Sequence, residues 1–169
     1  MTERWKPSVT VAAIVERVVD GERRYLLVEE HTDRGLRLNN PAGHLDAGES
    51  LDQAVVREVL EETARRFEPQ ALVGVYLSRF HRPDTDESED VTYLRFAFCG
   101  TVSEPESERT LDEGIVRTLW LTPDELRASA AMHRSPLVQQ CIDDHLAGRR
   151  YPLQLLRAHP SLYDPWVPG

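Results

Sequence analysis

The sequence contains little cysteine and no long hydrophobic run. Its 2 cysteines, Cys99 and Cys141, lie too far apart for metal-ligand spacing. We interpret both as reduced, partly buried thiols of a cytosolic protein. The N-terminal stretch MTERWKPS lacks the apolar segment of a signal peptide, and the run from Val11 to Val15 is too short to cross a bilayer. We therefore expect a cytoplasmic protein without a membrane span.

Positive charge is also scarce. The 20 Lys and Arg residues are outnumbered by 29 Asp and Glu residues, which gives a formal net charge of -9. This balance argues against binding to nucleic acid polymers and to anionic membranes. It leaves phosphorylated small molecules open as ligands, because a bound divalent cation inverts the local field of an acidic site.

The pattern of residues along the sequence predicts strands intermixed with helices. Residues 9–19 and 23–30 read as a hairpin around the turn-forming pair Asp20-Gly21. Residues 31–43 are turn-rich, and residues 82–90 read as a solvated acidic loop. Further strands are expected over residues 71–81, 91–102 and 115–121. The intermixed elements indicate an α/β or α+β layered domain.

Three capping signals place the helices. Ser50 and Gln53 form a capping box, which predicts a helix from about 51 to 65. Thr122 and Glu125 cap a second helix, and a third is expected over 136–147 with Gly148 as its stop. From about residue 151 the tail holds 4 of the 11 prolines, so we expect it to be irregular and to lie across the body. With no repeat and no linker visible, residues 1–169 are expected to form a single domain.

The helix expected over 51–65 has two faces. At about 100° per residue, Glu58, Glu61 and Glu62 share an arc of about 100°. A separate apolar arc is suited to packing on a sheet and contains Val55, Val56, Val59, Leu60 and Phe67. One interpretation is a solvated surface, since Glu61 and Glu62 have Arg65 and Arg66 four residues later.

The preceding loop favours a metal site instead. Carboxylates on adjacent turns supply the hard oxygen ligands that Mg²⁺ or Mn²⁺ prefers beside waters and substrate phosphates. Gly43 lets a backbone carbonyl approach such a metal, because it has no Cβ. Glu49 precedes the helix, where it is placed to hold the Arg57 guanidinium and fix the loop to the helix.

These residues resemble a known motif. Gly43, Glu49 and the run REVLEE at 57–62 match the Nudix box, G-x5-E-x7-R-E-U-x-E-E-x-G-U, in which U is aliphatic. Ala64 stands in place of the motif's glycine, and Arg65 in place of its aliphatic residue. Ala64 suggests a longer helix or a different exit, and Arg65 either neutralises part of the metal site or points away.

The resemblance extends beyond the motif, to the bacterial NudJ-type phosphatases of the Nudix superfamily. The similar segments cover most of the chain in order: PSVTVA (7–12), LLVEE (26–30), NPAGHLDAGESL (40–51), YLRFAF (93–98), RSPLV (134–138) and GRRYPLQLL (148–156). Leu38 departs from the tryptophan expected before N-x-P-A-G-H, and we expect this difference to alter how a base or pyrimidine ring is held.

The resemblance implies an α/β/α sandwich with a mixed β-sheet and a Mg²⁺-dependent hydrolase (Mn²⁺ as an alternative) in monomeric or homodimeric form. Glu58 and Glu62 would be the principal metal ligands, and Glu61 a further ligand and the best general base within the motif. Arg57 would orient these carboxylates, and Glu49 would brace the loop. Outside the motif, Asp112 and Glu113 are alternative bases or simply solvated acids.

The implied reaction is hydrolysis of a phosphoanhydride bond. The implied substrates are nucleoside di- and triphosphates and pyrimidine pyrophosphates, including thiamin diphosphate and hydroxymethylpyrimidine pyrophosphate. Arg95, Arg134 and His44 are candidate substrate contacts, although each arginine is equally suited to a structural ion pair. The alternatives are hydrolysis of ADP-ribose, nucleotide sugars or dinucleotides, and a non-catalytic module that senses nucleotides.

Overall fold

A mixed β-sheet organises the protein, which we describe from a computed structural model that covers residues 4–81 and 90–165. The sheet has 7 strands, with five in the order β3-β2-β1-β6-β5, while β4 pairs with β1 and β7 pairs with β2. Strand β1 is parallel to β6, and the other pairings are antiparallel. The strands are β1 (Ser8–Val19), β2 (Glu22–Thr32), β3 (Gly35–Asn39), β4 (Ala42–His44), β5 (Phe67–His81), β6 (Asp90–Val102) and β7 (Ile115–Leu121).

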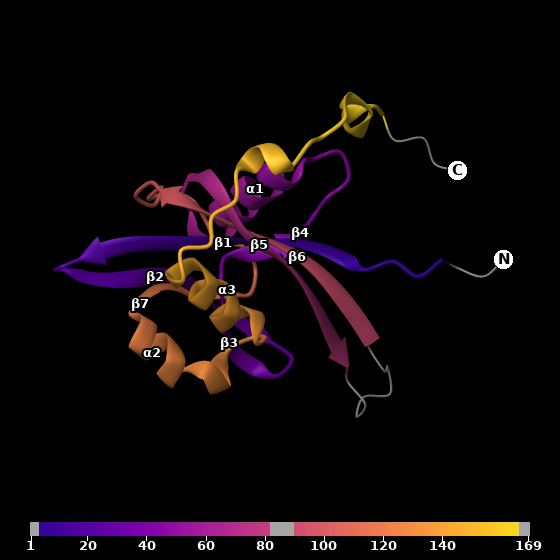
Figure 1. Ribbon diagram of the computed structural model, residues 1–169. Helices are drawn as coiled ribbons and strands as arrows, with labels where there is room; N and C mark the ends of the chain where they lie inside the picture. Colours follow the sequence, from indigo (N-terminus) through magenta and orange to yellow (C-terminus); the bar gives the residue numbers. More distant parts are fainter. Residues whose placement is uncertain (1–3, 82–89, 166–169) are drawn as a thin grey trace.

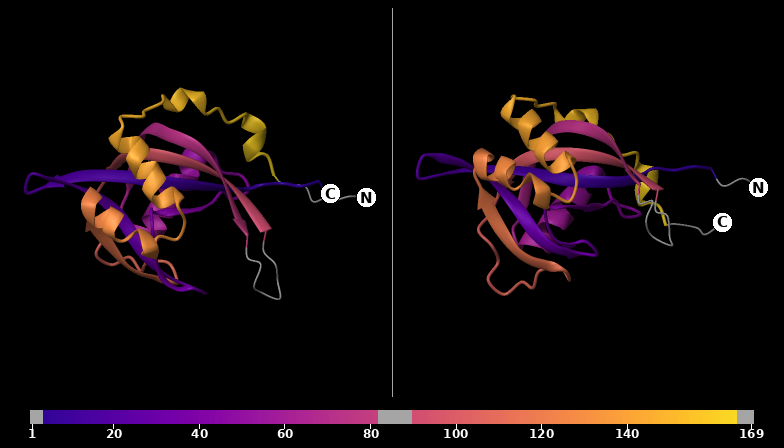
Figure 2. Two further views of the ribbon diagram at one scale, coloured as in Figure 1. Left: turned by 60° about the horizontal axis from the view of Figure 1, so that its bottom comes forward. Right: turned by 90° about the horizontal axis from the view of Figure 1, so that it is seen from below.

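Helices cover both faces of this sheet (Figures 1 and 2). Helix α1 (Leu51–Thr63) packs Val55 and Val59 onto one face, against the odd-numbered residues of β1 such as Val11. Helices α2 (Pro123–Ala128) and α3 (Leu137–Leu146) contribute to the core cluster on the other face, which includes Ile14 of β1. Each fully buried valine of α1 contributes about 1.5–3 kcal/mol through burial. The expected α/β/α sandwich with a mixed sheet is confirmed.

The predicted hairpin, the strands over 71–81, 91–102 and 115–121, and the three helices are confirmed within a few residues. Asp20 and Gly21 adopt positive φ angles of 51° and 79°, as a tight turn requires. The turn-rich segment 31–43 does contain a turn at 33–34, but it also contains β3 and the start of β4, which pair with β2 and β1. The acidic loop predicted over 82–90 lies outside the described residues except for Asp90, which begins β6.

Helix α1 ends two residues earlier than predicted. Ser50 is its N-cap, and the Gln53 side chain accepts a hydrogen bond from the Ser50 N–H at 2.9 Å. Ala64 takes the left-handed conformation with φ 55° and ψ 24°, which is the conformation that a glycine adopts most readily. The chain therefore leaves the helix through a left-handed turn despite the alanine, and the expected longer helix is wrong. Phe67 consequently lies in β5 rather than on the apolar face of the helix.

The last part of the chain crosses the α1 side of the sheet (Figure 1, yellow). Tyr151 exchanges backbone hydrogen bonds of 2.8 and 2.9 Å with Leu72 of β5. Leu153 and Leu156 pack against the core cluster that contains α1. Two short 3-10 helices, η2 (Leu153–Leu155) and η3 (Pro160–Tyr163), follow α3. No helix in residues 4–81 and 90–165 is long and apolar enough to cross a membrane.

Candidate active site

The side chains of Glu58 and Glu62 are buried between α1 and β4 rather than exposed to bulk solvent. The two residues are 8% and 7% exposed. The Glu62 carboxylate accepts a hydrogen bond from the Ala42 N–H at 2.8 Å. A Cβ added to Gly43 would overlap the carboxylate carbon of Glu58, so a larger residue here must displace that side chain. The motif glycine thus brings the strand backbone into direct contact with a buried acid.

Arg57 links the loop to these carboxylates. Its Nε and Nη2 donate to the two carboxylate oxygens of Glu49 at 3.0 and 2.7 Å, which is a bidentate pair. Its Nη1 donates to Glu58 at 2.7 Å and to Glu61 at 3.0 Å. Its Nη2 also donates to the backbone carbonyl of His44 at 2.9 Å. One guanidinium therefore fixes the approach of the loop and the orientation of two helix carboxylates.

The alternative of a solvated, salt-bridged helix surface is wrong. Arg66 donates to Glu106 at 2.8 Å, and Arg65 donates to the Ser103 carbonyl at 2.9 Å. Both arginines lie beyond the end of α1, so neither pairs with Glu61 or Glu62. Arg65 is 7% exposed and points away from the carboxylates, which leaves their negative charge uncompensated on that side.

Burial and mutual repulsion alter the acidity of these carboxyl groups. Burial raises the pKa of Glu62 to about 8, with further increases from the nearby charges of Glu58, Glu30 and Asp112. Burial also raises the pKa of Glu58, although its bond to Arg57 opposes the effect. Two buried acids that are hard to ionise side by side are the environment that a cation relieves.

The donor set fits a divalent cation held partly by other ligands. In the described part of the chain, no group of three or more His, Cys, Asp or Glu side chains is arranged to hold a metal ion by itself. Mg²⁺ does not need such a cage, because it usually binds one or two carboxylates and completes its shell with waters and substrate phosphates. The buried oxygens of Glu58 and Glu62, the partly exposed Glu61 and the glycine-lined backbone at Gly43 suit this mode.

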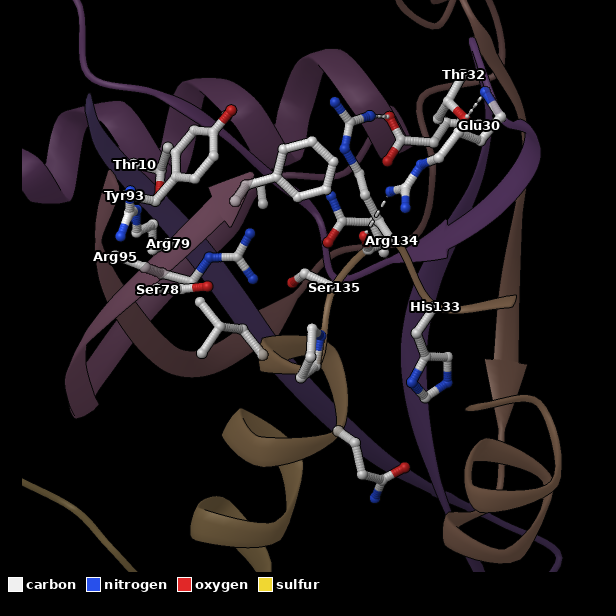
Figure 3. A pocket seen from close by; sticks show the side chains of 18 of the residues that line it. Thr10, Glu30, Thr32, Ser78, Arg79, Tyr93, Arg95, His133, Arg134 and Ser135 are labelled. Carbon is white, nitrogen blue, oxygen red and sulfur yellow. Dashed lines mark hydrogen bonds and ion pairs between the residues drawn. The ribbon is translucent and has the colours of Figure 1, made fainter. Parts of the chain in front are cut away.

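A cavity of about 800 Å³ adjoins the glycine of the motif. Ala42, Gly43 and His44 belong to its lining, whereas the carboxylates of α1 do not. Residues from β1, β2, β5 and β6 and the segment before α3 complete its wall (Figure 3). Phe80 and Tyr93 contribute aromatic surface to the lining. The volume and the mixture of aromatic and polar groups suit a small phosphorylated molecule.

The three predicted substrate contacts all line this cavity but differ in environment. His44 is exposed, and its ring centroid lies 6.2 Å from that of Tyr93. Arg134 is paired with Glu30 at 2.6 Å, which is the structural ion pair considered as its alternative. Arg95 is 9% exposed and has no carboxylate partner within the described residues.

Several cavity residues carry no sequence signal that would have identified them. Glu30 is buried and holds Arg134, while Thr10 and Ser135 belong to the cavity lining. Leu38, which replaces the expected tryptophan, is a core residue that is absent from the cavity lining. Of the two candidate bases outside the motif, Asp112 lies close enough to α1 for its charge to raise the pKa of Glu58 and of Glu62.

Comparison with known proteins identifies the class. The NUDIX domain family matches residues 8–141, so the chain belongs to the Nudix family and is a hydrolase that acts on phosphoanhydride substrates. Among curated relatives, Phosphatase NudJ of Escherichia coli (strain K12) is 33% identical over 152 residues, which are 90% of this chain and 92% of that protein. The predicted resemblance to the NudJ-type phosphatases is thereby confirmed.

Solved structures agree with this assignment. A NUDIX hydrolase from Nitrosomonas europaea is 50% identical with a TM-score of 0.80, and the match covers 91% of this chain and 98% of that one. An Ap4A hydrolase of C. elegans is only 14% identical with a TM-score of 0.59, covering 83% of this chain and 96% of that one. The second likeness shows the fold alone.

Proposed function

We propose that the protein is a Mg²⁺-dependent phosphatase that removes phosphate from nucleoside di- and triphosphates and from pyrimidine pyrophosphates such as thiamin diphosphate and hydroxymethylpyrimidine pyrophosphate. The observation that carries the proposal is the burial of Glu58 and Glu62 beside the cavity edge formed by Gly43. The 33% identity to Phosphatase NudJ supports a phosphatase activity.

A divalent cation, when bound, would neutralise phosphate charge and favour ionisation of the attacking water. Glu58 and Glu62 would be its principal ligands, with Glu61 and the Gly43 carbonyl as further contributors. Mn²⁺ would serve in place of Mg²⁺, since both prefer carboxylate and carbonyl oxygens.

Glu61 is our choice for the general base. Its side chain is 36% exposed, against 11% for Glu58, so water reaches it more readily. Arg57 Nη1 holds its carboxylate at 3.0 Å, which restricts its orientation. Arg57 and Glu49 act as positioning residues, and His44, Arg95 and Arg134 would bind the substrate.

The test is a substrate panel with Mg²⁺ on wild type, Glu62→Gln, Glu61→Gln and the surface control Glu104→Gln, whose side chain is 85% exposed. We expect losses of about 10²-fold or more for the two site variants, because general-base and cation contributions are each of that order. The control should match wild type. Equal turnover in all four proteins would refute the catalytic assignment.

The released product separates the two enzymatic alternatives. Orthophosphate from a terminal phosphate supports the proposed phosphatase. Two monophosphates from ADP-ribose, a nucleotide sugar or a dinucleotide would instead assign a pyrophosphohydrolase to the same site.

A further inference from the structure

Arg95 of β6 is a buried cation that forms no ion pair within the described residues, although the nearby charge of Glu30 acts on it. It is 9% exposed, and its Nε and Nη1 have no hydrogen-bond partner within residues 4–81 and 90–165. Its guanidinium interacts with the buried thiol of Cys141 on α3, and burial lowers its pKa. A buried cation with unpaired hydrogen-bond donors is unfavourable, and an anion bound beside Arg95 would remove much of that cost.

The other arginines of the cavity are engaged. Arg134 holds Glu30 at 2.6 Å, and Arg79 donates to Asp90 at 2.7 Å. Arg34 lies over the Phe80 ring at 5.1 Å and donates to the Arg134 carbonyl at 3.1 Å. Arg95 therefore differs from them in having both burial and unfilled donors.

Two hydroxyls accompany this guanidinium. Thr10 of β1 is in direct register with Arg95 of β6, so both side chains project from the same face of the sheet. The hydroxyl oxygens of Thr10 and Ser135 are buried and have no hydrogen-bond partner in the described part of the chain. Figure 3 shows the Arg95 guanidinium and the Ser135 hydroxyl directed into the same part of the cavity.

We propose that Arg95, Thr10 and Ser135 form an oxyanion site that binds a phosphate group of the substrate without a metal ion. The inference rests on the proposed function for its source of phosphate, and it defines a binding site separate from the carboxylates of α1, which do not line this cavity. A tetrahedral phosphate accepts several hydrogen bonds at once and neutralises the guanidinium. A carbonyl of a heterocycle would satisfy the donors but would leave the charge uncompensated.

The site lies apart from the carboxylates. Arg95 and His44 flank Thr10 on opposite neighbouring strands, which places their backbones two strand spacings apart, about 10 Å. The carboxylates of Glu58 and Glu62 repel a phosphate unless a cation intervenes, whereas Arg95 attracts one directly. Binding at the Arg95 site should therefore persist when divalent cations are removed.

The test is a titration with inorganic phosphate in the presence of EDTA, followed by calorimetry and by thermal unfolding at constant ionic strength. We expect saturable binding to wild type and at least tenfold weaker binding to Arg95→Met. Arg79→Met is the matched control, because it removes the same charge from an exposed, ion-paired position of the same cavity, and it should change the affinity less than twofold. Absence of saturable binding to wild type, or equal weakening in both variants, would overturn the proposal.

A second variant tests the hydroxyls without removing the charge. Thr10→Val with Ser135→Ala should weaken phosphate binding three- to tenfold while the melting temperature stays the same or rises, because unpaired buried hydroxyls do not stabilise the fold. A lower melting temperature with unchanged phosphate affinity would assign these residues a structural role and contradict the proposal. Binding of an unphosphorylated nucleoside that depends on Arg95, without any binding of phosphate, would assign the site to a carbonyl and also contradict it.

The same titration on Glu62→Gln separates this proposal from the proposed function. That variant should lose hydrolysis but keep metal-independent phosphate binding. Loss of phosphate binding in Arg95→Met together with a raised KM for substrate supports the second site. Hydrolysis that survives in Glu62→Gln would refute the catalytic assignment and leave the oxyanion site to be judged by phosphate binding alone.

Discussion

Substitution of Gly43 by alanine tests the contact between the motif loop and the buried acid. Gly43 lies in β4, paired with Val11, and its φ is not in the left-handed region, so the backbone tolerates alanine. The added Cβ would overlap the Glu58 carboxylate and must displace it. That displacement breaks the 2.7 Å bond from Arg57.

The expected magnitude follows from these contacts. A hydrogen bond to a charged group contributes about 1.5–3 kcal/mol. The reduced freedom of alanine in the unfolded chain offsets about 0.4–1 kcal/mol. We therefore expect Gly43→Ala to lower the free energy of unfolding by about 1–2 kcal/mol and the melting temperature by about 2–8 °C. Activity should fall about 10²-fold, because a misplacement near 1 Å has that effect on positioned groups.

Urea unfolding and initial rates at saturating Mg²⁺ measure the two effects, and a double-mutant cycle with Glu58→Ala assigns them. In the Glu58→Ala background the space is open, so adding Gly43→Ala should not lower stability or activity further. An equal loss in both backgrounds would show that the alanine acts through some other contact. Wild-type activity in Gly43→Ala would refute the role of this close approach.

Three further predictions concern titratable groups. Burial lowers the pKa of His145 from 6.5 to about 4. As the pH falls, this histidine is therefore protonated in the unfolded chain before it is protonated in the folded one. The free energy of unfolding should decrease by up to about 3 kcal/mol between pH 6.5 and 4. Urea titrations should show this loss in wild type and its absence in His145→Gln. Because the pKa of Glu62 is about 8, binding of a cation below that pH releases a proton. The Mg²⁺ affinity measured by calorimetry should therefore increase by up to about tenfold for each unit of rising pH and become constant above pH 8. An affinity that does not change with pH would contradict this prediction. Cys99 and Cys141 are buried and their thiol pKa values are raised, Cys141 to about 11, so a disulfide reagent should label neither in the native state and both in urea.

Local signals in the sequence predicted the parts of the fold that local interactions determine. Ser50 and Gln53 marked the start of α1 because a capping box is formed by residues three apart. The Asp20-Gly21 turn was equally readable. Strands β3 and β4 were not, because Asn39, Asn40 and Pro41 read as turn residues, and the strands exist only through pairing with β2 and β1.

The candidate site shows the same division. The spacing from Gly43 to Glu62 was sufficient to group the carboxylates, since one loop and one helix carry them all. The different environments of Arg95 and Arg134 were not predictable, because the partner of Arg134 is Glu30, 104 residues earlier in the chain. The hydroxyls of Thr10 and Ser135 had no local pattern at all.

The left-handed alanine after α1 has a consequence for how the motif is read. A non-glycine residue in this conformation costs about 1–2 kcal/mol, which is small beside the 5–15 kcal/mol that holds a typical domain together. Ala64 still directs the chain through the same turn, and its N–H still bonds the Leu60 carbonyl at 3.0 Å. The motif glycine thus lowers the conformational cost of this turn but is not needed to place the carboxylates. A sequence search that requires glycine at this position would miss proteins that keep every acidic residue of the motif.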